Sequence, residues 1–275
     1  MDWQRIKQVG WGLIGAAFAA TFAVWMFFFP QAIDTAFAWK VEPRFAQVFI
    51  GAGYVFRTVF FLAIASQRDW LRIRWIFWGN LVFTGTLLLA TYWHIDQFLW
   101  HQAPTAHVWL ILYIFEPIAM IYLVPRGTFS AAPPTTGGLV HPVFKVILVA
   151  ITGLLLINGL LLVINPEFAA TRWPWELNPL DARIVAAWFL GWCVWCGTMA
   201  FATDWDEIRL AAGLFILNGI ALVAVGILFQ GEFLPDNPRS GAFVVGVGVM
   251  TLLMAGFSAY QELRRPARGG EPAVA

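Results

Sequence analysis

The sequence predicts an all-α fold: a polytopic transmembrane helix bundle of about eight spans. Its composition favours this class, because 60% of the residues are hydrophobic and only 12% are charged, whereas a soluble domain carries roughly a quarter charged residues. The mean hydropathy is +0.71. The apolar residues also form long continuous runs rather than an alternating pattern, which excludes a membrane-spanning β-barrel. A hydrocarbon environment is the simplest explanation of this composition.

Eight apolar runs in the sequence are long enough to cross a bilayer. A helix rises about 1.5 Å per residue, so roughly 20 residues cover the ~30 Å of hydrocarbon. The first run is longer than the h-region of a signal peptide, which spans about 7 to 15 residues. We therefore expect this run to be retained as a helix rather than cleaved. The predicted spans are residues 11–30, 46–66, 74–93, 107–125, 143–164, 183–203, 208–229 and 241–260.

The positions of Lys and Arg predict a multi-pass protein of the plasma (inner) membrane with both termini in the cytoplasm. With the N-terminus inside, eleven of the 17 Lys and Arg residues fall on the cytoplasmic side and five on the opposite side. This asymmetry satisfies the positive-inside rule. The cytoplasmic set is Arg5, Lys7, Arg68, Arg72, Arg74, Arg126, Lys145, Arg209, Arg264, Arg265 and Arg268, and the outer set is Lys40, Arg44, Arg172, Arg183 and Arg239.

Polar landmarks at the ends of the spans recur at an offset of about 135 residues. An Asp-Trp pair follows the second span at residues 69–70, and another follows the sixth span at residues 204–205. Such landmarks are harder to attribute to chance than similarity between apolar helices. We therefore expect a tandem duplication of a four-helix unit, with residues 1–135 and 136–275 as the two repeats. Four spans per unit give both copies one orientation, related by an axis along the membrane normal.

Two charged residues in the middle of predicted spans are the strongest candidates for a functional site. Arg57 lies in the second span and Glu116 in the fourth, at similar depths, where a charge costs at least ~2.5–3.5 kcal/mol. Tyr54 and Tyr113 each precede one of them by three residues and share its helix face. The four side chains are predicted either to bind a substrate, an ion or a proton at the midplane, or to lock two helices together.

The Arg57–Glu116 pair has no counterpart in the second predicted repeat. At the matching offset stand apolar or weakly polar residues, namely Trp192 or Cys193 for the arginine and Met250 or Thr251 for the glutamate. Any site that is built on this pair is therefore predicted to be asymmetric.

Three asparagines lie inside further spans, at Asn80, Asn158 and Asn218. Such amides commonly hydrogen-bond between helices, at roughly 0.6–2 kcal/mol each. They could instead line a polar path through the membrane. The first interpretation is favoured, and it predicts that each asparagine contacts a neighbouring helix.

Three histidines flank the outer loop between the third and fourth spans. His94, His101 and His107 lie close together in the sequence, with Asp96 between the first two. Imidazoles beside a carboxylate could hold a metal ion, or one histidine could ligate a haem. The spacing matches no specific ligand signature, and histidine in an interfacial loop is ordinarily amphipathic surface. A metal site here is the weaker of the two site predictions, and the cofactor stays unassigned.

The sequence favours two functions over catalysis. The first is transport of a small solute or ion through a polar site in the bundle. The alternative is a non-catalytic accessory subunit of a larger membrane complex, which binds pigment, quinone or partner helices. The chain carries no phosphate-binding glycine loop, no His-Glu-x-x-His and no Gly-x-Ser-x-Gly, so a membrane enzyme comes third. The lipid bilayer is the predicted environment, with membrane-protein partners or a homo-oligomer possible. The net charge of +1 argues against nucleic acid.

Overall fold

The computed structural model describes residues 3–124 and 137–265, and within these ranges the regular structure is helical throughout. Eight of the described helices are long and apolar enough to cross a membrane, which confirms the prediction of about eight spans. They are α1 (Trp3–Phe28), α3 (Arg44–Ser66), α4 (Arg74–Trp93), α5 (Pro104–Leu123), α6 (Pro142–Ile164), α8 (Pro179–Phe201), α9 (Trp205–Leu228) and α10 (Pro238–Leu263). Short helices and single 3₁₀ turns form parts of the connections: α2 (Pro30–Ala36), α7 (Pro166–Ala170), η1 (Trp70–Arg72), η2 (Ile95–Gln97) and η3 (Gln230–Glu232).

The first helix begins eight residues earlier than its apolar run predicts, at Trp3 instead of residue 11. Polar side chains on this extra stretch donate to carbonyl groups at the C-terminal end of α3. Arg5 Nη1 donates to Gln67 O at 2.7 Å and Gln8 Nε2 donates to Ile64 O at 2.7 Å. The last carbonyls of a helix have no partner within the helix, so these side chains satisfy them and extend α1 beyond its apolar run.

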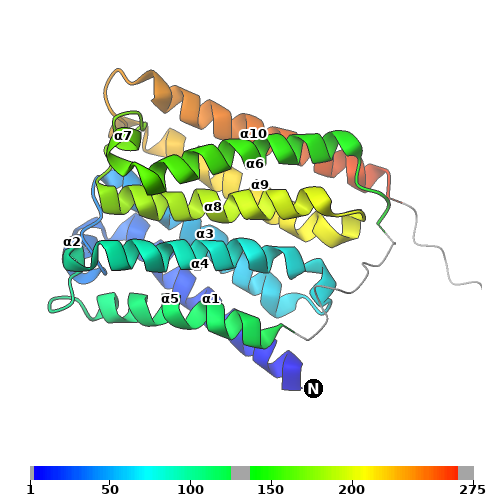
Figure 1. Cartoon of the computed structure of the whole chain (residues 1–275), viewed down its shortest axis with the longest axis horizontal. Helices are drawn as coiled ribbons and strands as arrows, with labels where there is room; N and C mark the ends of the chain where they lie inside the picture. The colour runs from blue at the N-terminus through cyan, green and yellow to red at the C-terminus, as the bar shows by residue number, and fades with distance from the viewer. Residues whose placement is uncertain (1–2, 125–136, 266–275) are drawn as a thin grey trace, which may run out of the picture.

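The long helices lie side by side along one axis, with α2 and α7 at one end of the bundle (Figure 1). The first described residues of α1 and the last of α10 lie at the opposite end. In the centre, α4 packs against α8 and α3 packs against α9. The outer helices attach to this core: α1 to α3, α5 to α4, α6 to α8 and α10 to α9. Consequently α3 and α8 are the most deeply buried spans, and α6 and α10 are the least buried.

The close contact between α4 and α8 depends on glycine. A Cβ atom at Gly79 would lie 2.6 Å from the carbonyl oxygen of Gly191, and a Cβ atom at Gly191 would lie 3.0 Å from Cβ of Phe83. In a membrane, helices gain little by excluding water from one another, so they associate through close van der Waals packing between small residues. These two glycines therefore set how closely the central helices approach.

Several contacts recur between the two halves of the described chain. Asp69 Oδ1 accepts from Leu71 N at 3.0 Å, and Asp204 Oδ1 accepts from Asp206 N at 2.8 Å. Each aspartate thus caps the segment that begins at its own Asp-Trp pair. The pairing of α1 with α3 and of α6 with α8 follows the same order. These features are compatible with the tandem duplication, which stays a prediction.

A buried hydrogen bond and a tilted ring contact join the two halves near the end that carries α2 and α7. Trp39 Nε1 donates to Asp181 Oδ1 at 2.8 Å, and both side chains are buried. Trp175, 136 residues after Trp39, lies instead against the ring of Phe45, with ring centroids 4.5 Å apart. Phenylalanine offers no hydrogen-bond acceptor, and Trp175 Nε1 has no partner among the described residues. The contacts that Trp39 and Trp175 make between the two halves therefore differ: the first is a hydrogen bond, and the second is a contact between aromatic rings.

Candidate functional site

A buried polar network links three helices of the first half. Arg57 on α3 forms an ion pair with Glu116 on α5 through Nη2 and Oε1, and both side chains are almost fully buried. Arg57 Nη1 donates to Asn80 Oδ1 on α4 at 2.8 Å. Asn80 Nδ2 in turn donates to Glu116 Oε1 at 2.9 Å. Each charge therefore has a charged partner and a neutral hydrogen-bond partner, which is the arrangement that a buried ion pair requires.

Aromatic rings surround this network. The guanidinium of Arg57 lies 5.0 Å from the ring centroid of Phe61 and 4.8 Å from that of Phe83, distances at which cation–π attraction operates. The hydroxyl groups of Tyr54 and Tyr113 lie 3.4 Å apart beside the pair. The structure thus brings together the four residues that the sequence predicts, and it adds Asn80. The sequence indicated this asparagine as a hydrogen-bonding side chain between helices, but it did not indicate its partners.

The space beside the Arg57–Glu116 pair is small. A cavity of about 60 Å³ lies between the pair and α1, and another of about 20 Å³ lies on the side of α4 and α8. Both are far below the ~300–1,000 Å³ of small-molecule sites, so a larger solute would not fit beside the pair. The geometry accommodates water or a small ion here, and it also suits a structural lock between α3, α4 and α5.

The three histidines of the outer loop do not share one group of metal ligands. His94 contacts Arg183 of α8 through Nε2 and Gln97 through Nδ1, whereas the ring of His107 lies 5.5 Å from that of Trp100. Burial, followed by the positive charge of Arg183, lowers the pKa of His94, so this imidazole stays neutral at neutral pH. Over residues 3–124 and 137–265, no three His, Cys, Asp or Glu side chains are placed to hold a metal ion.

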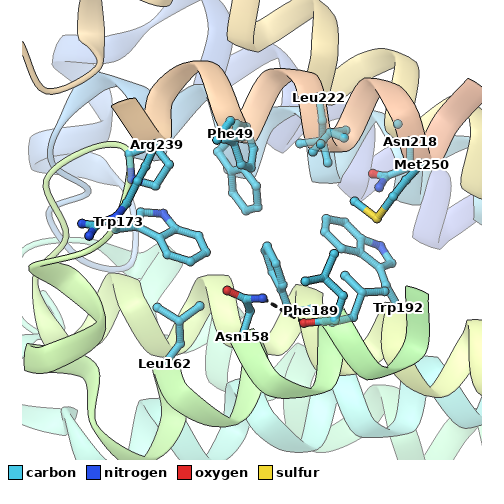
Figure 2. Close-up of a pocket in the computed structure, with 18 of the residues that line it drawn as sticks. Phe49, Asn158, Leu162, Trp173, Phe189, Trp192, Asn218, Leu222, Arg239 and Met250 are labelled. Carbon is cyan, nitrogen blue, oxygen red and sulfur yellow. Dashed lines mark hydrogen bonds between the residues drawn. The ribbon is translucent and has the colours of Figure 1, made fainter. Parts of the chain in front are cut away.

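A cavity of about 460 Å³ lies in the second half, between α6, α8, α9 and α10. Figure 2 shows it between α10 on one side and α6 on the other, with Arg239 and Trp173 at one end and Met250, Asn218 and Trp192 at the other. The lining residues on α10 run from Arg239 to Thr251, a rise of about 18 Å at 1.5 Å per residue. The cavity is therefore long, narrow and mainly apolar.

The two ends of this cavity differ in chemistry. Arg172 and Arg239 lie at the end near α7, outside the bulk of the apolar lining. Deeper in the membrane, the lining includes Asn158 and Asn218. Asn158 Nδ2 donates to Leu154 O of its own helix at 2.8 Å. This contact differs from the predicted hydrogen bond to a neighbouring helix, because an asparagine side chain can return to the carbonyl one turn earlier.

Three buried polar atoms of the lining have no partner among the described residues. They are the indole nitrogens of Trp173 and Trp192 and Oδ1 of Asn218. No water is present in hydrocarbon to satisfy such groups, and each unsatisfied group costs several kcal/mol. The wall of this cavity therefore retains hydrogen-bonding capacity that no described residue uses.

Four residues that line the cavity stand at a fixed sequence offset from members of the polar network. At an offset of 135 residues, apolar or small side chains stand where the network has polar ones: Trp192 for Arg57, Phe215 for Asn80, Thr251 for Glu116 and Phe189 for Tyr54. Among the described residues, no ion pair joins α8 to α10. The sequence analysis did not predict this cavity. The only related signal in the sequence was the absence of a charged pair at the matching offset.

The fold and the apolar spans define the chain as a multi-pass integral membrane protein of the helix-bundle type. The chain matches no protein-family model, and neither the curated proteins nor the solved structures compared with it gave a match.

Proposed function

We propose that this membrane protein binds a lipid-soluble chain molecule in the cavity between α6, α8, α9 and α10. The observation that carries the proposal is the cavity itself, whose volume of about 460 Å³ falls within the ~300–1,000 Å³ of small-molecule sites. Its lining is mostly aliphatic and aromatic, with a few polar groups that can orient a ligand. A hydrophilic solute would lose its hydration in such a space, whereas a hydrocarbon chain would not.

The position of the cavity gives such a molecule a direct route from the bilayer. The cavity lies between α6 and α10, which make few contacts with each other and are the least buried spans. A molecule dissolved in the lipid can therefore enter sideways, without crossing an aqueous phase. This lateral route favours a lipid-like ligand over a water-soluble one.

A bound chain molecule fits the role of a non-catalytic binding protein or accessory subunit of a larger membrane complex. The exposed faces of α6 and α10 offer apolar surface to lipid or to partner helices. Pigments and quinones are also lipid-soluble chain molecules. The mass and the absorbance spectrum of a molecule bound to the purified protein would distinguish them from lipids.

The Gly246→Phe variant tests the proposed function. Gly246 lines the cavity, and a Cβ atom at this position would have no neighbour within 4 Å, so a larger side chain can be accommodated there. We expect Gly246→Phe to fill part of the cavity and to reduce the amount of bound chain molecule at least about tenfold. Native mass spectrometry of the full chain, purified in mild detergent, measures this amount. Gly256→Phe is the matched control, because Gly256 lies on the same helix, has equally open surroundings and is not in the lining. Equal occupancy in both variants would refute the proposal.

A second candidate function is transport past Arg57 and Glu116. Two observations favour it: both ionisable side chains lie deep within spans, and a cavity of about 60 Å³ adjoins them. Ionisable groups at this depth often belong to ion or proton pathways. Proton uptake into proteoliposomes tests this candidate. Transport is supported if the unchanged protein takes up protons and the Arg57→Met/Glu116→Leu double variant does not. If the unchanged protein causes no uptake, the proton-transport hypothesis is ruled out.

Three further predictions remain part of the proposal. The excess of Lys and Arg at the end that holds Trp3 supports a plasma (inner) membrane protein with that end in the cytoplasm. Tags on both termini should then be accessible only from the cytoplasmic side.

The repeated caps and helix pairings support residues 1–135 and 136–275 as tandem repeats. An association with other membrane proteins or with further copies would use the exposed apolar faces.

A further inference from the structure

We infer that the chain molecule carries an anionic head group, which the mouth of the cavity binds through Arg172, Arg239 and Trp173. The inference rests on the proposed function and adds the chemical class of the ligand: an acyl chain that ends in a carboxylate or a phosphate. The chain would lie in the apolar part between α6 and α10. The head group would lie at the end near α7, where the lining becomes positively charged.

The mouth presents donors and little to balance them. Two guanidinium groups line it, and the indole N–H of Trp173, a side chain only 7% exposed, has no hydrogen-bond partner among the described residues. Neither arginine forms an ion pair with a carboxylate of the described chain. An arginine is always charged and binds carboxylate and phosphate oxygens through its planar array of N–H groups. This set of groups therefore favours an anion.

The other cations at the same end of the bundle are already engaged. Lys40 pairs with Glu42 at 2.7 Å. Arg44 Nη1 donates to Gln47 Oε1 at 2.8 Å, and its Nη2 donates to a main-chain carbonyl of α1. Arg183 contacts His94. By contrast, Arg172 lies over the ring of Phe168 and Arg239 reaches only the carbonyl of Thr171, at 3.3 Å. Arg44 and Arg183 are held by neutral partners away from the cavity, so among the described cations at this end Arg172 and Arg239 are the two that line it.

Hydrogen bonds hold the two sides of the mouth together. Asn237 Nδ2 donates to Trp173 O at 2.9 Å, and Leu234 N donates to Pro174 O at 3.0 Å. The contact from Arg239 to Thr171 O places its guanidinium beside the residue that precedes Arg172. The start of α10 is therefore fastened to the connection between α7 and α8. A mouth that is ordered before binding loses less entropy when it captures a head group.

The depth of the mouth matches the head-group region of a bilayer. The positively charged end lies at the first turn of α10, and the apolar lining continues for about 18 Å along that helix. This length is more than half of the ~30 Å hydrocarbon layer. A lipid that entered between α6 and α10 could keep its head group at the interface while its chain followed the cavity inward.

Binding of four defined probes to the full chain in detergent tests the inference. Hexadecanoate and hexadecanol share a chain length and differ in charge, and a phosphatidylglycerol and a phosphatidylcholine with the same acyl chains differ in net charge. In mildly alkaline buffer, where the carboxylate is ionised, we expect the anionic member of at least one pair to bind about tenfold more tightly. A preference within the first pair identifies a fatty acid, and one within the second pair identifies a phospholipid.

The Arg172→Gln/Arg239→Gln double variant should reduce the anionic preference to within about twofold, mainly because the anionic probe binds more weakly. Retained binding of hexadecanol, together with an unchanged size-exclusion profile, shows that this variant is folded. Lys40→Gln, which removes a cation at the same end outside the cavity, should keep the preference. Equal affinities for charged and neutral probes, or a preference that survives the double variant, would overturn the head-group inference while Gly246→Phe still blocks binding. Failure of all four probes to bind, or binding that Gly246→Phe does not affect, would instead overturn the proposed function.

Discussion

Replacing Arg57 with methionine should destabilise the detergent-solubilised protein by about 3–5 kcal/mol, because removing one partner of a buried ion pair leaves the other charge uncompensated. Glu116 would lose its charged partner among the aromatic rings of α3, α4 and α5, and Asn80 would remain as its hydrogen-bond donor within the described chain. Glu116→Leu should have a similar effect for the same reason, since the guanidinium would remain buried.

The double variant Arg57→Met/Glu116→Leu should be much more stable than either single variant. Replacing both charges by apolar side chains removes the cost of burying them, and such exchanges are often neutral or stabilising. Thermal unfolding of the four proteins in one detergent gives the coupling energy. Lys40→Ala breaks an exposed ion pair with Glu42 and should change the midpoint very little. Losses that simply add in the double variant would show that the two charges do not stabilise each other.

Gly79→Leu should destabilise the bundle by at least about 3 kcal/mol, at or above the upper end of the usual cost of overpacking. A Cβ atom at this position would lie 2.6 Å from the carbonyl oxygen of Gly191. Main-chain atoms cannot rotate away as a side chain can, so α4 and α8 would have to separate. The expected result is a lower thermal midpoint and a smaller monodisperse fraction in size-exclusion chromatography.

Gly85 provides the matched control for Gly79. It lies on α4 six residues later, and a Cβ atom there meets nothing within 4 Å. Gly85→Leu adds the same side chain to the same helix without moving α8, so its thermal midpoint should stay close to that of the unchanged protein. A similar loss for both variants would mean that the added side chain, and not the contact with Gly191, is responsible.

Much of the architecture could be predicted because hydrocarbon imposes strict conditions on a chain. Apolar runs of about 20 residues can cross the bilayer only as helices, which pair their backbone groups internally. The same conditions made Arg57 and Glu116 conspicuous, since uncompensated charges are costly at that depth. Their similar depths made a pair geometrically possible, and the structure brings them together.

The rest of the candidate sites depended on how each helix is rotated and which neighbours it meets. The partners of Asn80 are one example, since its side chain bridges Arg57 and Glu116 from a third helix. The long cavity is another, because it arises where α10 and α6 stay apart. Spacing along the chain carries little information about rotation in helices that are apolar on all faces, so these features were not visible in the sequence.

The sequence by itself determined that the chain crosses the membrane as a helical bundle of about eight spans and that two opposite charges lie at one depth in its first half. Both conclusions follow from the cost of leaving polar groups in hydrocarbon. Only the tertiary structure decided that the charges are locked by Asn80, and that Arg172 and Arg239, 67 residues apart in the sequence, face one cavity. Contacts between helices distant in the chain create such neighbours, and no local pattern encodes them.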